Sequence, residues 1–303
     1  MLDQVWAAPV WRPLRRLWNK LIGNRFLRAL RANPPDVVIA THFFPAELLA
    51  SERRAGRLSS RLVVVVTDLF PHRLWLTPGA DLVVVGSEIT AGWCRARGVP
   101  AERLAVLGVP VAEAFGRPVD RDALRRQLGL DPARRTVLVV SGGMGVGPME
   151  LIVRKLCEPG SAWGERLQLL VVCGQNERLR QRLQDVALSA AMPMQVFGFV
   201  DTMPQLMQAS DVMVSKAGGL AVAEAAAVGL PLVLCGVIPG QEQFNAEVMV
   251  REGAAVLAER PEHAVVQVVT LLNRPARLEL MRTCAQRLGR PRAAEDIVEW
   301  IGG

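Results

Sequence analysis

The sequence predicts an α/β protein with two tandem domains, each a parallel sheet covered on both faces by helices. The chain has 303 residues, which is enough for two domains of ordinary size. Half of these residues are apolar, so a large core can be buried. Short runs of valine and leucine alternate with helical stretches, a pattern typical of buried parallel strands joined by helices.

The first series of strands and helices occupies residues 36–107. Strands are expected at residues 36–40, 62–66, 82–85 and 104–107, and helices at residues 46–54 and from the end of the third strand through Arg97. Three of these strands end in polar or glycine pairs, namely Thr41-His42, Thr67-Asp68 and Gly86-Ser87. In open α/β sheets the ligand crevice lies at the carboxyl ends of the strands, so these pairs mark an expected functional edge.

A break in the pattern separates the two series. Residues 116–120 have the composition of a linker, and a helix with an acidic start follows over residues 120–130 until Asp131-Pro132 ends it. The second series has strands at 136–140, 167–173, 194–197, 211–214, 232–234 and 255–257, and one or two helices within 277–300 close the chain. We therefore predict two Rossmann-like domains, residues 1–118 and 119–303.

Charge and cysteine content restrict the class of protein. The formal net charge is +7 and comes mostly from arginine, which favours anionic partners but also fits simple solvation. The five cysteines, Cys94, Cys157, Cys173, Cys235 and Cys284, form no CxxC pair and adjoin no histidine pair. They are expected to be small core residues in a reduced compartment. No apolar run approaches the ~20 residues of a membrane span, and no secretory signal is evident.

Residues 1–33 combine tryptophan and arginine in an unusual way. Trp6, Trp11 and Trp18 interleave with seven basic side chains, and no acidic residue occurs between Asp3 and Asp36. A basic, tryptophan-bearing amphipathic helix is typical of segments that lie in a membrane interface. A helix packed on the domain with a solvated arginine face is the alternative.

The segment from Val214 to Asn245 carries the clearest chemical signal. A short apolar strand is followed at once by Gly218 and Gly219, and then by an alanine-rich helix with Glu224 in its second turn. A helix N-terminus with free N–H groups and a closely approaching glycine backbone suits a phosphate group. A carboxylate one turn further along can reach sugar hydroxyls, so the segment predicts a nucleotide-sugar site.

Other motifs point away from common nucleotide chemistry. The loop Ser141-Gly-Gly-Met-Gly-Val-Gly147 follows a strand, but Pro148 stands where a dinucleotide fingerprint needs its third glycine. Gly142 and Gly143 are instead expected to let an oligophosphate or a facing domain approach. The pair Asp120 and Asp122 has DxD spacing but opens a helix, so N-capping is expected. The histidines lack metal-ligand spacing, and no metal site is predicted.

Three residues in the first domain are candidates for acid–base chemistry. Asp68 and His72 share one loop that follows a strand, and His42 ends the neighbouring strand. A carboxylate and an imidazole in one crevice can transfer a proton or position an acceptor. A loop-fixing aspartate beside a surface histidine is the alternative.

Taken together, these residues resemble the family of monogalactosyldiacylglycerol synthases and processive diacylglycerol glycosyltransferases, and more distantly the peptidoglycan N-acetylglucosaminyltransferase. The stretches that carry the likeness in the first domain are PDVVIATHFFPAELL, VVTDLFPHRLW and GADLVVVGSE. Those in the second are RRTVLVVSGGMGVG, VFGFVDTMPQLMQASDVMVSKAGG, GLPLVL and PGQEQFNAEVMVREGAA. As a set they are more specific than any single motif, and the likeness covers nearly the whole chain.

The resemblance implies a type-B glycosyltransferase fold, with two Rossmann-like domains facing across a cleft. It implies a UDP-sugar donor, a lipid acceptor and inversion at the anomeric carbon, with no metal and no cofactor. By position, Phe199 and Val200 would hold the uracil, and Gly218, Gly219 and Leu220 would bind the diphosphate. Glu224 would hold the ribose hydroxyls, while Gln241, Glu242 and Asn245 would contact the sugar or the diphosphate.

The chain departs from this family's pattern in two places. Ala221 stands where the family usually has threonine, which removes one hydroxyl from the diphosphate site. The family also opens with a strand and a glycine-rich loop bearing a histidine, and this sequence begins after that unit, so the first domain is expected to be incomplete. Two alternatives therefore stay open, a non-catalytic relative that binds nucleotide-sugar and a nucleotide-sugar epimerase. The expected location is cytoplasmic, peripheral to the anionic inner face of the plasma membrane, with no nucleic-acid partner.

Overall fold

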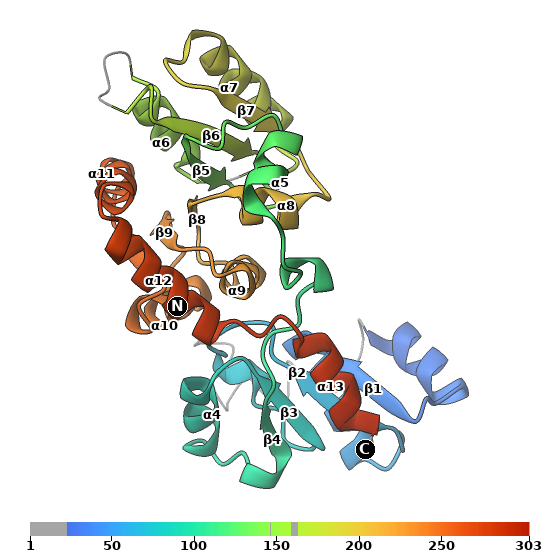
Figure 1. Ribbon diagram of the computed structural model, residues 1–303. Helices are drawn as coiled ribbons and strands as arrows, with labels where there is room; N and C mark the ends of the chain where they lie inside the picture. The colour runs from blue at the N-terminus through green and yellow to red at the C-terminus, as the bar shows by residue number, and fades with distance from the viewer. Residues whose placement is uncertain (1–22, 146, 159–162, 303) are drawn as a thin grey trace. The chain divides into compact units, whose positions relative to one another are not determined.

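The computed structural model describes residues 23–145, 147–158 and 163–302, which form two compact units (Figure 1). The first unit contains the residues up to Val109 together with Glu295–Gly303, and the second contains Pro110–Ala294. Each unit is a parallel sheet with helices packed against it, as the alternation of strands and helices predicts. The α/β fold class predicted from the sequence is thereby confirmed.

The first unit is built on a four-stranded parallel sheet in the order β1-β2-β3-β4. Its strands are β1 Val37–Ala40, β2 Arg61–Val65, β3 Leu82–Val85 and β4 Leu104–Val106. Its helices include α3 Phe43–Arg54, α4 Glu88–Arg95, α13 Ala293–Gly302 and the short turns η2 Arg73–Trp75 and η3 Ala101–Arg103. Residues 23–32 are also helical.

Alternating side chains of this sheet fill two separate cores. Leu62 and Val64 face α3 and α4 and pack against buried residues such as Leu49 and Cys94. Val63 and its neighbours on the other face pack against Ile297 of α13. This period-two alternation is what a strand imposes, and it explains why both faces need a helical cover.

The second unit contains a six-stranded parallel sheet in the order β10-β9-β8-β5-β6-β7. The strands are β5 Arg135–Val140, β6 Leu167–Val172, β7 Met194–Phe197, β8 Val212–Ser215, β9 Leu232–Cys235 and β10 Ala255–Ala258. The helices are η4 Glu113–Phe115, α5 Arg121–Gln127, α6 Met149–Leu156, α7 Glu177–Ser189, α8 Met203–Ala209, α9 Gly219–Val228, α10 Gln241–Arg251, α11 Pro261–Leu272 and α12 Pro275–Leu288.

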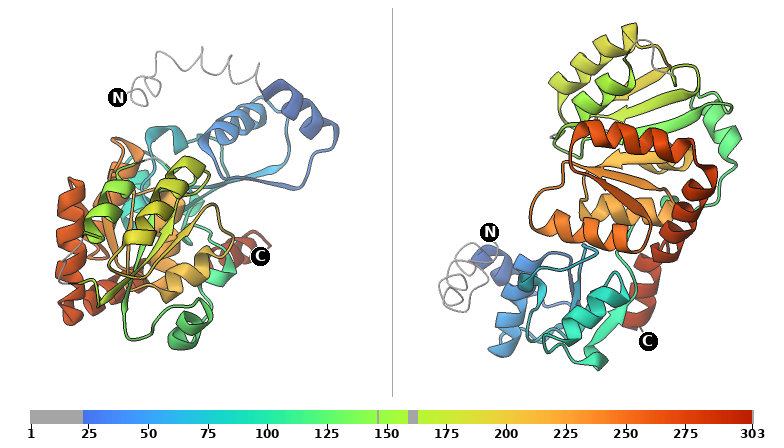
Figure 2. Two further views of the ribbon diagram at one scale, coloured as in Figure 1. Left: turned by 90° about the horizontal axis from the view of Figure 1, so that it is seen from above. Right: turned by 90° about the vertical axis from the view of Figure 1, so that its left-hand side faces the viewer.

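Helices cover both faces of this sheet (Figures 1 and 2). Helices α6, α7 and α11 pack side by side in one layer, while α5, α8 and α9 form the other. The strand order reverses between β5 and β8, because the chain runs outward through β6 and β7 and then returns to build β8, β9 and β10. Such a reversal opens a crevice at the carboxyl ends of the two central strands, where ligands of α/β sheets bind.

The sequence predicted a boundary between residues 118 and 119, whereas the second unit of the structure begins at Pro110. The structure assigns residues 110–118 to the second unit, because the Gln208 amide donates to the carbonyls of Ala114 and Arg117 at 3.1 and 2.9 Å. It also returns the last residues to the first unit. There the Arg61 guanidinium donates to the Ile301 carbonyl at 3.1 Å and lies 5.5 Å from the centre of the Trp300 ring.

Two further expectations concern the whole chain. All five cysteines are free, and four of them are buried, as expected for core residues. Among the residues that the structure describes, none of the helices has both the length and the apolar character that a membrane span requires. Most of the tryptophan-rich segment predicted to touch a membrane, residues 1–22, lies outside the described residues.

A buried carboxylate links three segments of the first unit and makes its stability depend on pH. Glu52 is 1% exposed and is paired with Arg57 at 2.7 Å and with Arg31. The hydrogen bonds from Arg57 and Arg31 lower the pKa of Glu52 to about 2, although its burial acts in the opposite direction. Because the folded pKa lies below the ordinary value of 4.5, the stabilisation is present above pH 4.5 and is lost as the pH falls toward 2.

Replacing Glu52 by Gln is therefore expected to lower the free energy of unfolding at pH 7 by about 1–2 kcal/mol. The value is modest because both guanidinium groups are partly exposed to solvent. Urea denaturation at pH 7 and at pH 3 measures this difference, which should shrink at the lower pH. Glu88→Gln is the control, since Glu88 pairs with Arg95 at the surface. An equal loss of stability in the two variants would contradict the assignment.

Candidate active site

A pocket of about 680 Å³ lies at the carboxyl edge of the second sheet, where the strand order reverses between β5 and β8. Its walls come from the loops after β5, β6, β7 and β8 and from the first turns of α9 and α10. The lining residues are Val140, Gly142, Gly143, Val172, Gly174, Phe199, Val200, Met203, Ser215, Lys216, Gly218, Gly219, Leu220, Ala221, Glu224 and Glu242. Nine of the eleven predicted donor-binding residues are thus brought together: Gly142, Gly143, Phe199, Val200, Gly218, Gly219, Leu220, Glu224 and Glu242.

The N-terminus of α9 forms one wall of the pocket. Strand β8 ends at Ser215, and Gly218 is the N-cap of the ten-residue helix α9. Because glycine has no side chain, it cannot satisfy the N–H groups of the first turn, which stay available to a ligand. A Cβ atom at Gly218 would meet nothing within 4 Å, so the space in front of this backbone is open. The wall suits an anionic group.

The Glu224 carboxyl group lies in the same pocket, on the second turn of α9. Burial raises the pKa of Glu224 to about 7. A carboxyl group held in this way accepts hydrogen bonds well once it ionises, and hydroxyl donors from a ligand favour the ionised form. The position and the pKa together suit the recognition of paired sugar hydroxyls.

The glycine-rich loop after β5 forms the floor of the pocket by packing backbone against backbone. Gly145 has φ +62°, and a Cβ atom there would lie 2.4 Å from the Cys173 carbonyl oxygen. Gly174 has φ +59°, and its Cβ atom would lie 2.4 Å from the Gly142 carbonyl oxygen. Only glycine fits both positions, and the close packing keeps the backbone of Gly142 and Gly143 at the pocket surface. The Phe199 ring, 67% exposed, adds a flat apolar face from the loop after β7.

A charged pair that the sequence analysis did not identify also lines the pocket. The Lys216 ammonium lies 3.7 Å from Oε1 of Glu242, and each side chain is 19% exposed. Oε2 of Glu242 accepts from the backbone N–H of Ile238 at 3.0 Å. A cation directly after β8 was the signal in the sequence, but its meaning depends on knowing that β8 adjoins β5.

Gln241 and Asn245 are the two predicted donor-binding residues that do not line the pocket. The Asn245 side chain is fully buried, and its Nδ2 donates to the Ala217 carbonyl at 3.1 Å. It therefore holds the loop between β8 and α9 from behind. Gln241 is the first residue of α10, directly before Glu242.

The three candidates for acid–base chemistry lie at the carboxyl edge of the first sheet. His42 is the N-cap of α3, and its Nδ1 accepts from the Phe44 N–H at 3.2 Å. His72 caps η2 in the same way, with its Nδ1 accepting from the Leu74 N–H at 3.2 Å. Both rings lie beside Phe43: the centroids are 4.2 Å apart for His42 and 4.7 Å apart for His72. Asp68 is buried in the loop that follows β2.

The DxD pair lies at the start of α5. Oδ1 of Asp120 accepts from the N–H groups of Asp122 and Ala123, both at 3.0 Å, and so caps α5 as predicted. Within residues 23–145, 147–158 and 163–302, no three histidine, cysteine, aspartate or glutamate side chains are grouped to hold a metal ion.

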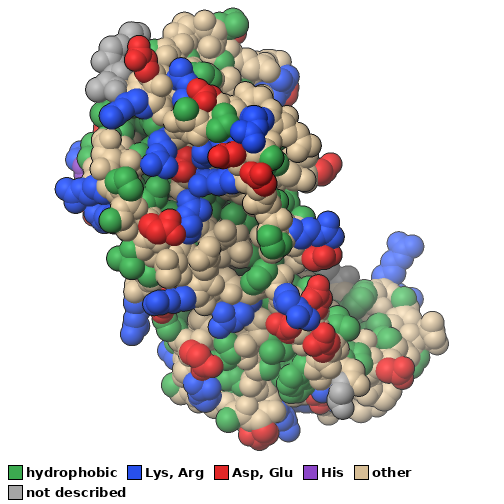
Figure 3. Space-filling model, viewed as in Figure 1, with side chains coloured by type: hydrophobic (Ala, Val, Ile, Leu, Met, Phe, Trp, Pro, Cys, Tyr) green, Lys and Arg blue, Asp and Glu red, His purple; other side chains and the backbone are tan. Residues whose placement is uncertain are grey.

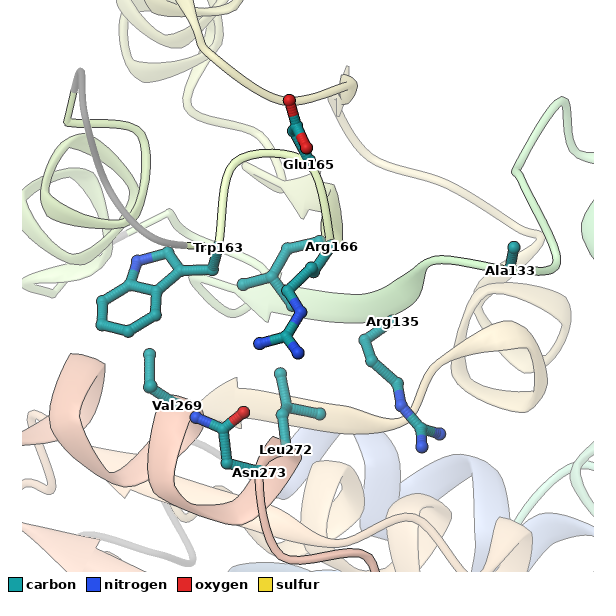
Figure 4. A pocket seen from close by; sticks show the side chains of 9 residues that line it. Ala133, Arg135, Trp163, Glu165, Arg166, Val269, Leu272 and Asn273 are labelled. Carbon is teal, nitrogen blue, oxygen red and sulfur yellow. The ribbon is translucent and has the colours of Figure 1, made fainter.

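A second cavity, of about 310 Å³, lies at the opposite edge of the same sheet (Figure 4). Arg135 at the start of β5, Trp163, Arg166 and the end of α11 line it. The Arg135 guanidinium forms an ion pair with Asp211, with a guanidinium nitrogen 3.5 Å from Oδ1 of Asp211.

On the face drawn in Figure 3, basic and acidic side chains are interspersed, so no single basic patch dominates that face. The cavity at the carboxyl edge is therefore the candidate site.

Comparison with known proteins identifies the family of this chain. Residues 9–111 match the family described as monogalactosyldiacylglycerol synthase, and residues 136–297 match the glycosyltransferase family 28 C-terminal domain. A processive diacylglycerol β-glucosyltransferase of Bacillus thuringiensis is 30% identical over 285 residues, which cover 94% of this chain and 72% of that protein. The chain belongs to this glycosyltransferase family. The recognition made from its motifs is confirmed.

Solved structures show that this family 28 chain has the type-B glycosyltransferase fold. MurG of Acinetobacter baumannii superposes with a TM-score of 0.66 at 19% identity, covering 91% of this chain and 76% of that one. The S. aureus protein MnaA, solved with UDP, superposes with a TM-score of 0.70 at 15% identity, covering 95% and 80%. At these identities the likeness concerns the fold.

Proposed function

We propose that this protein transfers a hexose from a UDP-sugar to a diacylglycerol-type lipid, with inversion at the anomeric carbon and without a metal ion. The observation that carries the proposal is the pocket at the reversal point of the second sheet. It combines an N-terminus of α9 without a side-chain cap and the half-buried carboxyl group of Glu224 in a chain of this family. The MnaA structure, a protein of the same fold, holds UDP.

Each wall of the pocket has a role in donor binding under this proposal. The N–H groups of Gly219 and Leu220 hold the diphosphate, and the positive end of the α9 dipole stabilises the negative charge that develops on departing UDP. The Glu224 carboxylate accepts hydrogen bonds from the ribose hydroxyls. Phe199 and Val200 hold the uracil, and Glu242 accepts from a sugar hydroxyl. Gln241 and Asn245 support these groups from α10, Asn245 through its bond to Ala217.

The acceptor is proposed to be a lipid of the diacylglycerol type. The relative from Bacillus thuringiensis carries this acceptor in its name, and it aligns with 94% of the chain. Asp68, His42 and His72 are the proposed groups for positioning the acceptor hydroxyl and accepting its proton. Both histidines already use Nδ1 as a hydrogen-bond acceptor, so neither ring can take up a proton at that atom without losing its helix-capping bond. Asp68 can accept a proton without a change of tautomer, and it is therefore the preferred base.

A transfer assay tests the proposal directly. UDP release is measured with UDP-glucose and with UDP-galactose, in the presence of anionic vesicles that contain diacylglycerol. We expect release that depends on diacylglycerol, that persists in EDTA and that Asp68→Asn lowers at least ~100-fold, as expected for the loss of a general base. The glycolipid product should have the anomeric configuration opposite to that of the donor.

Two outcomes of the assay would favour the other readings. UDP binding without any turnover would mean that the chain is a non-catalytic relative. Conversion of the UDP-sugar to an isomer without lipid would mean that it is an epimerase. The control is the Asp131→Asn variant, since Asp131 lies in the second unit at the turn before β5 and outside the pocket.

A further inference from the structure

We propose that Lys216 is the cation that binds the diphosphate of the donor and stabilises the departing nucleotide, with Glu242 holding its ammonium group in place. This inference rests on the proposed binding of a UDP-sugar and adds a residue to that site. Lys216 is the first residue after β8, and Gly142 follows β5 at the same edge of the sheet. The lysine therefore stands at the reversal point of the strand order, where the pocket opens.

The stem of the lysine runs past the glycine-rich loop. A Cβ atom at Gly142 would lie 3.7 Å from Cε of Lys216, and one at Gly147 would lie 3.7 Å from its Cδ. The stem therefore runs alongside the loop, with room for a methyl group between them, and the Lys216 side chain is only 19% exposed. The ammonium group then lies 3.7 Å from Glu242, which is itself held by the Ile238 N–H. A lysine whose side chain is largely buried loses less freedom on binding than a surface lysine does.

The charges of the pocket require such a cation. Among the described residues that line it, Lys216 is the one basic side chain; it pairs with Glu242, and Glu224 is the other acidic residue of the lining. A diphosphate brings further negative charge into this space. Without Lys216, the Glu242 carboxylate would repel the ligand across a half-buried pocket, where charges are screened less than in water. With it, the ammonium group can bridge the carboxylate and the diphosphate.

Lys216 and Glu242 act on different groups of the donor. Lysine acts as a point charge toward phosphate oxygens, and it needs no fixed geometry to do so. Glu242 has its Oε2 committed to Ile238 and its Oε1 directed at Lys216. The pair therefore presents a positive group to the phosphates and a negative group to sugar hydroxyls. Lys216 takes a share of the leaving-group stabilisation that a metal ion supplies in other transferases.

Binding measurements with UDP and uridine test the inference. Lys216→Met is expected to weaken UDP about 10- to 100-fold, as loss of a charged contact does, and to leave uridine within about twofold. Lys216→Arg should retain most of the UDP affinity, and its UDP binding should keep the dependence on salt that Lys216→Met loses. Calorimetry measures UDP, and ligand-observed NMR measures uridine. Lys155→Met is the matched control, because Lys155 pairs with Glu262 outside the pocket.

A double variant separates binding of the diphosphate from simple neutralisation of Glu242. If Lys216 only cancels that carboxylate, Lys216→Met combined with Glu242→Gln will regain the UDP affinity of the unmodified protein, and the inference is wrong. If Lys216 binds the diphosphate, the double variant stays weak for UDP. Unchanged UDP affinity in Lys216→Met would also overturn the inference while leaving UDP binding intact. Absence of UDP and uridine binding by the unmodified protein would instead refute the proposed function.

Discussion

Replacing Glu224 by Gln is expected to weaken UDP binding about 100-fold at pH 8 and to make the affinity for uridine independent of pH. Burial raises the pKa of Glu224 to about 7 in the empty pocket, whereas hydrogen bonds from ribose hydroxyls favour its ionised form. Binding should therefore release a proton below pH 7. In the unmodified protein the affinity should fall as the pH decreases from 8 to 6, by up to about tenfold per unit below the pKa.

Uridine is the ligand for the pH series, because it carries no phosphate group that titrates between pH 6 and 8. Calorimetry or ligand-observed NMR at pH 6, 7 and 8 gives the affinity for each protein. Glu247→Gln is the control, since Glu247 lies exposed on α10 and outside the pocket. A flat pH profile in the unmodified protein, or equal affinities in the Glu224 and Glu247 variants, would contradict the assignment of Glu224.

When the pocket is empty, the ionised Glu224 carboxylate should lower the free energy of unfolding. A folded pKa above the ordinary 4.5 means that the folded state holds its proton more tightly, so stability falls as the pH rises from 4.5 to about 7. At pH 8 the neutral amide of Glu224→Gln removes this cost. The variant should therefore melt at a higher temperature than the unmodified protein at pH 8 while binding UDP more weakly, an exchange of stability for function.

Replacing Asp211 by Asn is expected to lower the free energy of unfolding of the second unit by about 3–5 kcal/mol. Asp211 is 1% exposed and accepts from Arg125 at 2.7 Å, from Arg121 at 3.1 Å and from the Thr136 N–H at 2.7 Å. The Arg125 side chain is 6% exposed, so the variant would leave a buried guanidinium without its counter-charge. These contacts join α5 to the start of β5 and β8.

Urea denaturation gives the size of this loss, and hydrogen exchange shows where it occurs. Protection should fall in peptides of β5 and β8 and stay unchanged in the first unit. Glu113→Gln is the matched control, because the pair of Glu113 and Arg117 at 3.1 Å is largely exposed and is expected to contribute less than about 0.5 kcal/mol. A loss below 1 kcal/mol for Asp211→Asn would mean that the buried cluster is not a stabilising feature.

Local patterns were enough to predict the strands and part of the candidate site, and the family resemblance supplied the other candidate residues. The run of leucine and valine between Asp81 and Gly86 predicted β3 with its observed ends, because such a run has few other ways to be buried. The stretch Met194–Phe197, bounded by Pro193 and Gly198, likewise predicted β7. The same logic found Gly218 and Glu224, since a glycine pair and an acid one turn later lie in one short segment. It also predicted that Asp120 caps α5, a contact within three residues along the chain.

The features that the sequence did not predict depend on contacts between distant segments. The role of Lys216 requires β8 to lie beside β5, an order that neither strand encodes by itself. Asn245 has the polar character of a ligand-binding residue, yet it faces inward on α10 and bonds to Ala217. The predicted boundary at residue 118 differs from the division between the two units, because the amide that bonds to residues 114 and 117 comes from Gln208, about ninety residues later.

The return of the last residues to the first unit has a topological consequence. Since α13 completes the core beneath β2 and β3, the backbone passes from one unit to the other twice, once near residue 110 and once near residue 294. Cleavage of the backbone at one of these two connections would leave the units covalently joined through the second connection. The second unit is therefore an insertion within the first, and 110–294 is the contiguous stretch that a dissection should excise. Trimming the chain from its end would instead strip an apolar cover from Val63, Val65 and Leu82.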